Sequence, residues 1–186
     1  MKDFFQKLKT KAQKLNQRIL FPETDDLRTL KALKTIINEH LCQVILIGNQ
    51  KKITRLATKN KLKLDLSSVE FIDNHNSLLK QAFAEQLFNL RQKQGLTLQQ
   101  ASKLIDDPNY FAVMLLYNDF ADGLVSGATS STASTIKPAF QIIKTKNKNQ
   151  LASGCFMMVF PKKIYFFADC AVNPDPSAQE LAQIAE

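Results

Sequence analysis

Short, continuous apolar runs alternate with amphipathic segments along the first half of the chain, and this alternation limits the fold more than any other feature. An unbroken apolar run predicts a strand buried on both faces, whereas apolar residues three or four positions apart predict a helix. Strands are predicted at residues 18–22, 43–48 and 69–73, with helices at about 27–40 and 51–58 between them. Such strands need a helical layer on each face, so the sequence predicts an α/β fold with a parallel sheet.

Further helices and one more strand are predicted after the third strand. Leucine and phenylalanine recur at helical spacing from Ser77, which predicts a long helix that carries Arg91 near its end and is followed by Gly95. The next predicted elements are helices at 97–104 and 109–117, the second opened by Pro108, a strand at 121–126, a glycine- and hydroxyl-rich loop at 127–135 and a helix through 137–143.

The pattern of the C-terminal residues predicts the beginning of a second α/β domain. After a turn at 146–150, two strand-like runs at 153–160 and 164–168 predict a hairpin, and a final helix is expected at 178–185. We therefore expect an N-terminal α/β domain at residues 1–148 and the start of a second domain at 149–186. Because the helical pattern continues to Glu186 without a capping signal, we expect this second domain to be truncated.

Composition excludes some classes of protein and leaves others open. The net charge of +8 comes from scattered lysines rather than a dense basic block, which favours solvated surfaces, with steering of an anionic substrate as an additional role. No basic segment interleaved with aromatic residues predicts nucleic-acid binding, and no apolar run predicts a membrane span. Three cysteines without close pairing predict reduced, mostly buried thiols, and we expect a soluble, cytoplasmic protein without a metal site.

The loop at 127–135 is the strongest candidate for a binding site. It joins a predicted strand to a predicted helix, where backbone N–H groups and hydroxyls form a site for phosphate or carboxylate. The spacing is neither GxxxxGK[ST] nor GxGxxG, so the loop predicts neither type of nucleotide site. Hydroxyl residues before a helix also serve as simple caps, and that alternative stays open.

Few other residues carry chemistry on their own. Arg91 and Lys137 are candidate binders of phosphate groups, although a helix-end charge and a solvated lysine would explain them equally well. Asp122 and Asp169 could be acids or bases at strand ends, or simply turn carboxylates. No catalytic triad of a histidine with serine or cysteine can be recognised in the sequence, so the catalytic residues stay unknown.

Taken in order, these segments resemble the N-terminal half of phosphate acetyltransferases and the related phosphate butyryltransferases, over almost the whole chain. The resemblance is carried by Leu20–Arg28, Val44–Asn49, Leu90–Arg91, Gly95–Thr97, Asp107–Ala112, Ala121–Ala128, Ser131–Thr132, Thr135, Lys137–Ala139, Gln141–Thr145 and Phe167–Pro174.

The resemblance implies a two-domain fold like that of isocitrate and isopropylmalate dehydrogenases, a homodimer at full length, and a site between the domains. It implies reversible acetyl transfer between acetyl phosphate and coenzyme A, with coenzyme A as a substrate and no permanently bound cofactor. Substrate-binding roles are implied for Arg91, Ser130, Ser131, Thr132, Thr135 and Lys137; the last replaces the arginine usual in the family. The residues of the chemical step are expected in the absent C-terminal part.

Three functions therefore stand as hypotheses. The first is an incomplete phosphate acetyltransferase with little or no turnover by itself, and a preference for butyryl groups is its nearest variant. The second is a non-catalytic module that binds coenzyme A or acyl phosphate or forms an assembly surface. The third, nucleic-acid binding through the positive surface, lacks a supporting motif. We also expect Arg91 to reach the strand-to-helix bend near Ser131, so that both contact one anionic ligand.

Overall fold

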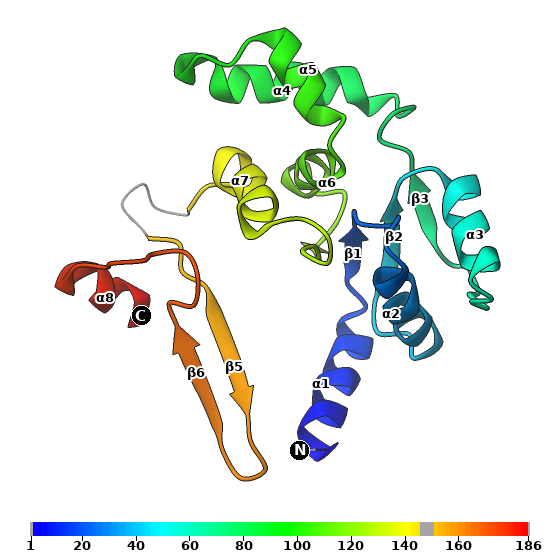
Figure 1. The fold of residues 1–186 in the computed structure, drawn as a ribbon, viewed down its shortest axis with the longest axis vertical. Helices are drawn as coiled ribbons and strands as arrows, with labels where there is room; N and C mark the ends of the chain where they lie inside the picture. Colours follow the sequence, from blue (N-terminus) through cyan, green and yellow to red (C-terminus); the bar gives the residue numbers. More distant parts are fainter. Residues whose placement is uncertain (1, 146–150, 186) are drawn as a thin grey trace. The chain divides into compact units, whose positions relative to one another are not determined.

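The computed structural model describes residues 2–145 and 151–185. The chain divides into two compact units, one formed by Lys9–Ile143 and the other by Met1–Leu8 with Lys144–Glu186 (Figure 1). The domain boundary that we expect at residue 148, like the turn expected at 146–150, lies outside the described residues. The division near residue 143 nevertheless separates the parallel sheet from the C-terminal hairpin.

A parallel four-stranded sheet forms the centre of the larger unit. Its strands are β1 (Arg18–Phe21), β2 (Gln43–Ile47), β3 (Glu70–Ile72) and β4 (Gly123–Leu124), in the order β3-β2-β1-β4. All three pairings are parallel, and Leu20 of β1 lies opposite Ile45 on one side and Leu124 on the other. The α/β fold with a parallel sheet is therefore confirmed.

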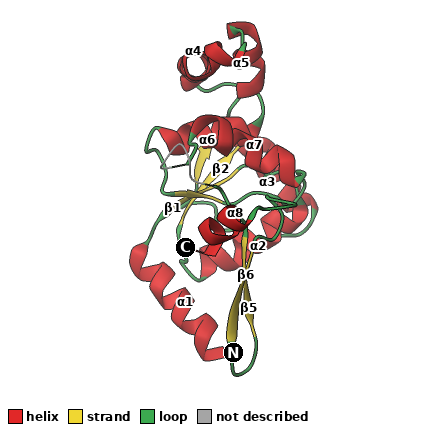
Figure 2. Ribbon diagram, turned by 90° about the vertical axis from the view of Figure 1, so that its left-hand side faces the viewer, coloured by secondary structure: helices red, strands yellow, loops and turns green. Residues whose placement is uncertain are grey.

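Helices cover both faces of this sheet (Figures 1 and 2). Leu20, Ile45 and Ile47 face one core, and the alternate residues Phe21 and Leu46 face the other. Side chains alternate between faces along a strand, so a fully apolar strand supplies both cores. The helices of the first core are α4 (Leu79–Arg91), α5 (Leu98–Ile105), α6 (Pro108–Tyr117) and α7 (Thr132–Ile142), and those of the second are α2 (Leu27–Asn38) and α3 (Gln50–Lys59).

Side-chain caps determine where several of these helices begin. Asp26 caps α2 and Asp107 caps α6, where Pro108 occupies the first helical position as predicted. Ser131 caps α7 by accepting a hydrogen bond from the N–H of Ser134. The loop predicted to extend to residue 135 therefore ends at 131, and Thr132 and Thr135 belong to the helix.

The smaller unit contains an antiparallel hairpin and a short helix. Strands β5 (Cys155–Val159) and β6 (Ile164–Ala168) pair with each other, and α8 (Ala178–Ala185) follows; helix α1 (Lys2–Leu15) begins in this unit. The predicted hairpin is confirmed. The three cysteines are free, as predicted, but the prediction that they are mostly buried is wrong. Cys42 and Cys170 are partly exposed, and Cys155 is exposed because the apolar strand that carries it is not covered.

Candidate functional site

A cavity of about 550 Å³ lies among the helices on the first-core side of the sheet. The end of α4, the turn after it, the outer side of α5, the start of α6 and the second half of α7 all contribute to its wall. Its lining residues are Arg91, Gln94, Gly95, Leu96, Gln100, Lys103, Leu104, Asp107, Tyr110, Lys137 and Gln141. Both candidate phosphate-binding cations, Arg91 and Lys137, therefore belong to one cavity.

The charge of this lining suits an anionic ligand. Arg91, Lys103 and Lys137 are cations, and Asp107 is the one carboxylate among the lining residues. One of the two carboxylate oxygens of Asp107 is already engaged, because Oδ1 accepts hydrogen bonds from the N–H groups of Asn109 and Tyr110. A ligand with several phosphate oxygens would meet converging positive charge and donors here.

The backbone before α5 brings Arg91 to the cavity. Arg91 is the last residue of α4, and a short 3₁₀ turn (Gln92–Gln94) follows it and ends at Gly95. Gly95 has φ +83°, a left-handed conformation that favours glycine. The turn reverses the chain into α5, which Thr97 caps reciprocally with Gln100.

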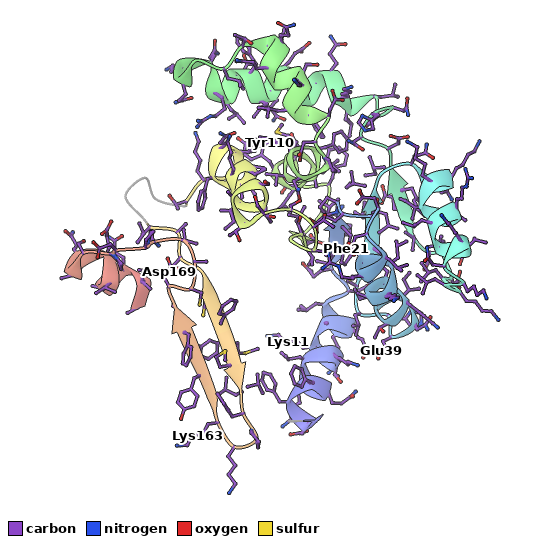
Figure 3. All side chains as sticks on the ribbon, in the orientation of Figure 1. Lys11, Phe21, Glu39, Tyr110, Lys163 and Asp169 are labelled. Atoms are coloured by element: carbon purple, nitrogen blue, oxygen red, sulfur yellow. The ribbon has the colours of Figure 1, made fainter. Side chains whose placement is uncertain are left out.

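Tyr110 connects α6 to α7 at the wall of the cavity (Figure 3). Its hydroxyl donates a hydrogen bond of 2.8 Å to Oε1 of Gln141, which lies one helical turn after Lys137. Burial, with a contribution from Asp107, raises the pKa of Tyr110, although Arg91 acts in the opposite direction. The hydroxyl therefore stays protonated and continues to orient the face of α7 that carries Lys137.

Replacing Tyr110 by phenylalanine is expected to lower the free energy of unfolding by about 1 kcal/mol, since one partly buried hydrogen bond is lost and the ring stays. Urea unfolding followed by circular dichroism measures this change. Tyr117→Phe, at an exposed position on the same helix, is the matched control. Equal stability of the two variants would show that the bond to Gln141 contributes nothing.

The loop before α7 holds an anion, but the anion is a side chain of the same chain. The carboxylate of Glu23, which is 5% exposed, accepts hydrogen bonds from the N–H groups of Gly127, Ala128, Thr129 and Ser130 and from the hydroxyl of Thr129. Gly127 has φ +109°, which turns its N–H into this array. The sequence predicts a loop that binds a phosphate or carboxylate ligand, and in the structure the donors of this loop hold the carboxylate of Glu23.

Two further contacts secure the same loop. Arg28 donates to the carbonyl oxygen of Ala128, and the buried Asn109 donates to Oγ of Ser130 at 3.1 Å while accepting from Oγ of Ser126 at 2.6 Å. Asn109 and Tyr110 are neighbours on α6, so one turn of α6 holds both the loop before α7 and the far end of α7. This arrangement positions Lys137 in the cavity.

The ionisation of Glu23 gives a pH prediction. Burial alone would raise its pKa, but the amides of Ser130, Ala128 and Thr129 outweigh burial and lower the pKa from 4.5 to about 2. A depressed pKa in the folded state stabilises the fold above the unfolded pKa, and this stabilisation is lost as pH falls from about 4.5 towards 2.

We therefore expect the free energy of unfolding of the wild type to be about 3 kcal/mol higher than that of the Glu23→Gln variant above pH 5. This difference should shrink steadily as the pH falls to 2. Urea titrations at several pH values measure this difference. A difference that stays constant between pH 6 and pH 3 would contradict the assignment of the ionised form.

The hydroxyl residues of the loop do not share the cavity with Arg91. Ser130, Ser131, Thr132 and Thr135 are absent from its lining, although Lys137 of the same helix belongs to it. In the bend itself, Glu23 and Asn109 engage Ser130 while Ser131 caps α7. The expectation that Arg91 reaches this bend stays a prediction. The substrate-binding roles of these four residues stay predictions.

The two candidate carboxylates at strand ends are engaged in local structure. Asp122 precedes β4 rather than following a strand, and it accepts from the N–H of Arg18 at 2.8 Å. Asp169, after β6 (Figure 3), accepts from the N–H groups of Ala171, Val172 and Asn173, and these bonds, that of Ala171 first, lower its pKa. The turn-carboxylate interpretation therefore describes both.

Sequence reasoning missed Glu23, Lys103, Tyr110 and Gln141. Glu23 lies directly after the carboxyl end of β1, between the neighbouring strands β2 and β4, the position at which open α/β sheets form their binding crevice. The place of Glu23 directly after a predicted strand was a usable signal of a binding crevice, but not of its partner. The other three residues had no signal of their own, because only the packing of α5, α6 and α7 brings them to one wall.

Another cavity, of about 680 Å³, lies at the carboxyl ends of β1, β2 and β3. Its lining combines Lys52 with the carboxylates of Asp25 and Asp73. Asp73 also accepts hydrogen bonds from Asn76 and Asn49, which lower its pKa against the opposing effect of burial, so it is ionised. Two carboxylates beside one cation favour phosphate less than the lining around Arg91 does.

Residues 2–145 and 151–185 were searched for membrane-spanning helices and for metal-binding groups of side chains, and neither was found. No helix there combines the length and apolar character needed to cross a membrane. No group of three or more histidine, cysteine, aspartate or glutamate side chains there could hold a metal ion.

Comparisons with known proteins agree with the fold. A phosphotransacetylase structure from Streptococcus pyogenes is 38% identical, with a TM-score of 0.87, and the match covers 100% of this chain and 56% of that one. The EutD phosphotransacetylase structure from Staphylococcus aureus is 40% identical, with a TM-score of 0.85 and coverage of 98% and 55%.

The relatives found by sequence are named phosphate acetyltransferases. Phosphate acetyltransferase from Bacillus subtilis is 42% identical over 189 residues, covering 100% of this chain and 56% of that protein. The Clostridium acetobutylicum enzyme is 39% identical over 180 residues, with coverage of 94% and 54%. The chain thus spans about half the length of these relatives. The family model described as "Phosphate acetyl/butaryl transferase" matches residues 3–186, so the chain belongs to the phosphate acetyl/butyryltransferase family.

Proposed function

We propose that this chain forms the N-terminal part of a phosphate acetyltransferase and that the cavity around Arg91 and Lys137 binds phosphate groups of its substrates. In this proposal the larger unit is the first domain of a two-domain fold of the isocitrate and isopropylmalate dehydrogenase type, and the hairpin begins the second. The full-length protein would be a cytoplasmic homodimer.

The proposal depends mainly on one observation. Arg91, at the end of α4, and Lys137, in α7, line the same cavity. Lys103 adds a third positive charge from α5. Coenzyme A carries several phosphate groups, and charge-assisted hydrogen bonds from arginine and lysine are strong ligands for phosphate. Glycine, leucine and tyrosine in the same lining supply apolar surface for the remainder of such a ligand.

The reaction moves an acetyl group in one displacement. The thiol of coenzyme A loses its proton to a general base and attacks the carbonyl carbon of acetyl phosphate, the bond from that carbon to the phosphate oxygen breaks, and inorganic phosphate leaves. The cavity would hold the phosphate-bearing substrates in position, which reduces the entropic part of the barrier. We expect the base and the groups that stabilise the carbonyl oxygen in the C-terminal part of a full-length chain.

Two measurements test this proposal. Calorimetry should detect binding of coenzyme A to the 186-residue chain, and a coupled assay of acetyl-CoA formation should detect little or no turnover until a C-terminal family sequence is joined to it. Absence of binding to a folded chain would refute the role of the cavity. A comparison of acetyl and butyryl phosphate in the joined protein decides the acyl preference.

A non-catalytic module that binds coenzyme A or acyl phosphate is the second candidate. The cavity around Arg91 and Lys137 supports this candidate too, because binding an anion there needs no catalytic group. Binding without turnover, even after a C-terminal family sequence is joined, would select this candidate over the enzyme.

Replacing Lys137 by arginine is expected to tighten coenzyme A binding several-fold, because a planar guanidinium can donate two parallel hydrogen bonds to one phosphate where the ammonium acts as a point charge. Calorimetry measures the change, with Lys34→Arg on the exposed side of α2 as the control. Unchanged or weaker binding by Lys137→Arg would show that phosphate does not reach residue 137.

A further inference from the structure

The cavity of about 680 Å³ at the carboxyl ends of β1, β2 and β3 takes no part in the proposed function. Its lining residues all belong to the larger unit, and helix α3, which begins shortly after β2, contributes to its wall (Figure 1). Open parallel sheets bind ligands in the crevice at this edge, and the volume falls in the range of small-molecule sites. The chemistry of the lining decides which kind of molecule fits.

Part of the lining is apolar. Ile53 and Leu56 lie three positions apart on α3, so they share one face of that helix, and both pack in the core that α3 covers. Ile47, the last residue of β2, and the prolines Pro22 and Pro108 add to this apolar surface. A hydrocarbon group of a ligand gains free energy when such a surface removes it from water.

The lining also contains a buried amide with an unused oxygen. Asn74 is 3% exposed, and its Nδ2 donates a hydrogen bond of 2.7 Å to the carbonyl oxygen of Asp106. Its Oδ1 accepts no hydrogen bond within the part of the chain that the structure describes. The buried side chains of Glu23, Thr24 and Asn109 all use their oxygens in hydrogen bonds. Since a buried amide oxygen without a donor is costly, Asn74 indicates a hydrogen-bond donor in the cavity.

Two carboxylates and one ammonium group line the same cavity. Asp25 follows β1 and Asp73 follows β3, so they come from the strands on either side of β2, and Lys52 comes from the first turn of α3. Among the described residues, neither Asp25 nor Lys52 has an ion-pair partner. Charges of both signs are therefore available to a ligand.

Asp73 has room for one further donor. Its Oδ2 accepts from the amides of Asn49 and Asn76, whereas its Oδ1 accepts only from the N–H of His75, at 3.1 Å, among the described residues. A carboxylate offers about four acceptor positions, so one remains on Oδ1. Asp73 and Asn74 are neighbours in the chain, and each contributes an acceptor to the lining.

These features exclude simpler ligands. A phosphate would meet two carboxylates for one ammonium group. A simple cation would leave Lys52 unmatched and would be repelled by it, and an uncharged hydrocarbon would leave Oδ1 of Asn74 without a donor. A small zwitterion with a hydrocarbon group satisfies the acceptors, the ammonium group and the apolar surface together.

We propose that this cavity binds a free α-amino acid with an apolar side chain. The ammonium group of the ligand donates to Oδ1 of Asn74 and pairs with Asp25 and Asp73, and its carboxylate pairs with Lys52. Its side chain contacts the apolar part of the lining. This site is separate from the cavity of Arg91 and Lys137, and the proposal does not depend on the proposed function.

Calorimetry of the 186-residue chain with L-leucine tests the proposal. L-Leucine should bind saturably. Isoamylamine, which lacks the carboxylate, and isocaproate, which lacks the ammonium group, should each bind at least about tenfold more weakly, because each loses a charge-assisted hydrogen bond. Glycine should also bind at least about tenfold more weakly, because it has no hydrocarbon side chain to bury.

Variants locate the site. Lys52→Gln and Asp25→Asn should each weaken L-leucine binding at least about tenfold, and both side chains are exposed, so urea unfolding should stay unchanged. Lys51→Gln is the matched control, because Lys51 is the neighbouring exposed lysine of α3 and is absent from the lining. Arg91→Ala, in the other cavity, should also leave L-leucine binding unchanged.

Several results would overturn the proposal. These are no binding of L-leucine, L-valine or L-phenylalanine to the folded chain, binding of isoamylamine as tight as that of L-leucine, and equal weakening by Lys51→Gln and Lys52→Gln. Loss of L-leucine binding in Arg91→Ala would place the amino acid in the other cavity and would overturn it too. Binding of coenzyme A without L-leucine would leave the proposed function intact and refute this site, whereas binding of L-leucine without coenzyme A would do the reverse.

Discussion

Replacing Glu23 by alanine is expected to lower the free energy of unfolding at pH 7 by about 3 kcal/mol, about as much as Glu23→Gln and more than Tyr110→Phe. The reason is the number of donors that converge on one carboxylate. Four consecutive backbone N–H groups, from Gly127 to Ser130, lose their acceptor together. Water can reach part of this loop, which keeps the expected loss below the sum of the separate bonds.

Urea unfolding at pH 7 measures the loss for Glu23→Ala. Asp25→Ala is the matched control, because Asp25 is an exposed carboxylate two positions further along the same loop, and its removal should change stability by less than about 0.5 kcal/mol. If the two variants unfold at the same urea concentration, Glu23 does not secure the loop before α7.

Replacing Arg91 by alanine is expected to weaken coenzyme A binding by about tenfold to a hundredfold. A hydrogen bond to a charged group contributes roughly 1.5–3 kcal/mol, which corresponds to this range of dissociation constants. Arg91 ends α4 at the cavity, and its side chain is partly buried, so its guanidinium has fewer alternative positions than that of a fully exposed arginine.

Calorimetry compares Arg91→Ala with Arg55→Ala, which removes the same charge from the exposed side of α3. The control separates a local contact from the general attraction of a chain with net charge +8 for anions. Equal weakening by both variants would mean that the cavity does not bind the ligand. Unchanged urea unfolding of Arg91→Ala would show that weaker binding does not come from a disturbed fold.

The parallel sheet and the helix starts could be predicted because they depend on local patterns. The run Val44–Ile47 is apolar at every position, and its side chains enter two cores alternately, which only a strand covered on both faces allows. Pro108 indicated the start of α6, because its fixed backbone angle suits the first turn of a helix; the structure adds Asp107 as the cap.

The candidate site could be predicted only in part. Arg91 and Lys137 were named from the sequence, and both line the cavity. Glu23 directly follows the first predicted strand, but its partners are 104 to 107 positions away. No local pattern reveals a bond across such a separation, so the loop's amides were assigned to a ligand rather than to this side chain.

The amino-acid sequence by itself determined the α/β class, the order of the elements, the anion-binding character of the loop after β4 and the membership in the family, because each is recorded in neighbouring residues or in ordered blocks of them. Only the tertiary structure decided which anion that loop holds and which cations share a cavity. Both depend on helices and loops that meet after the sheet has formed, when β1 and β4 become neighbours and bring Glu23 to Gly127.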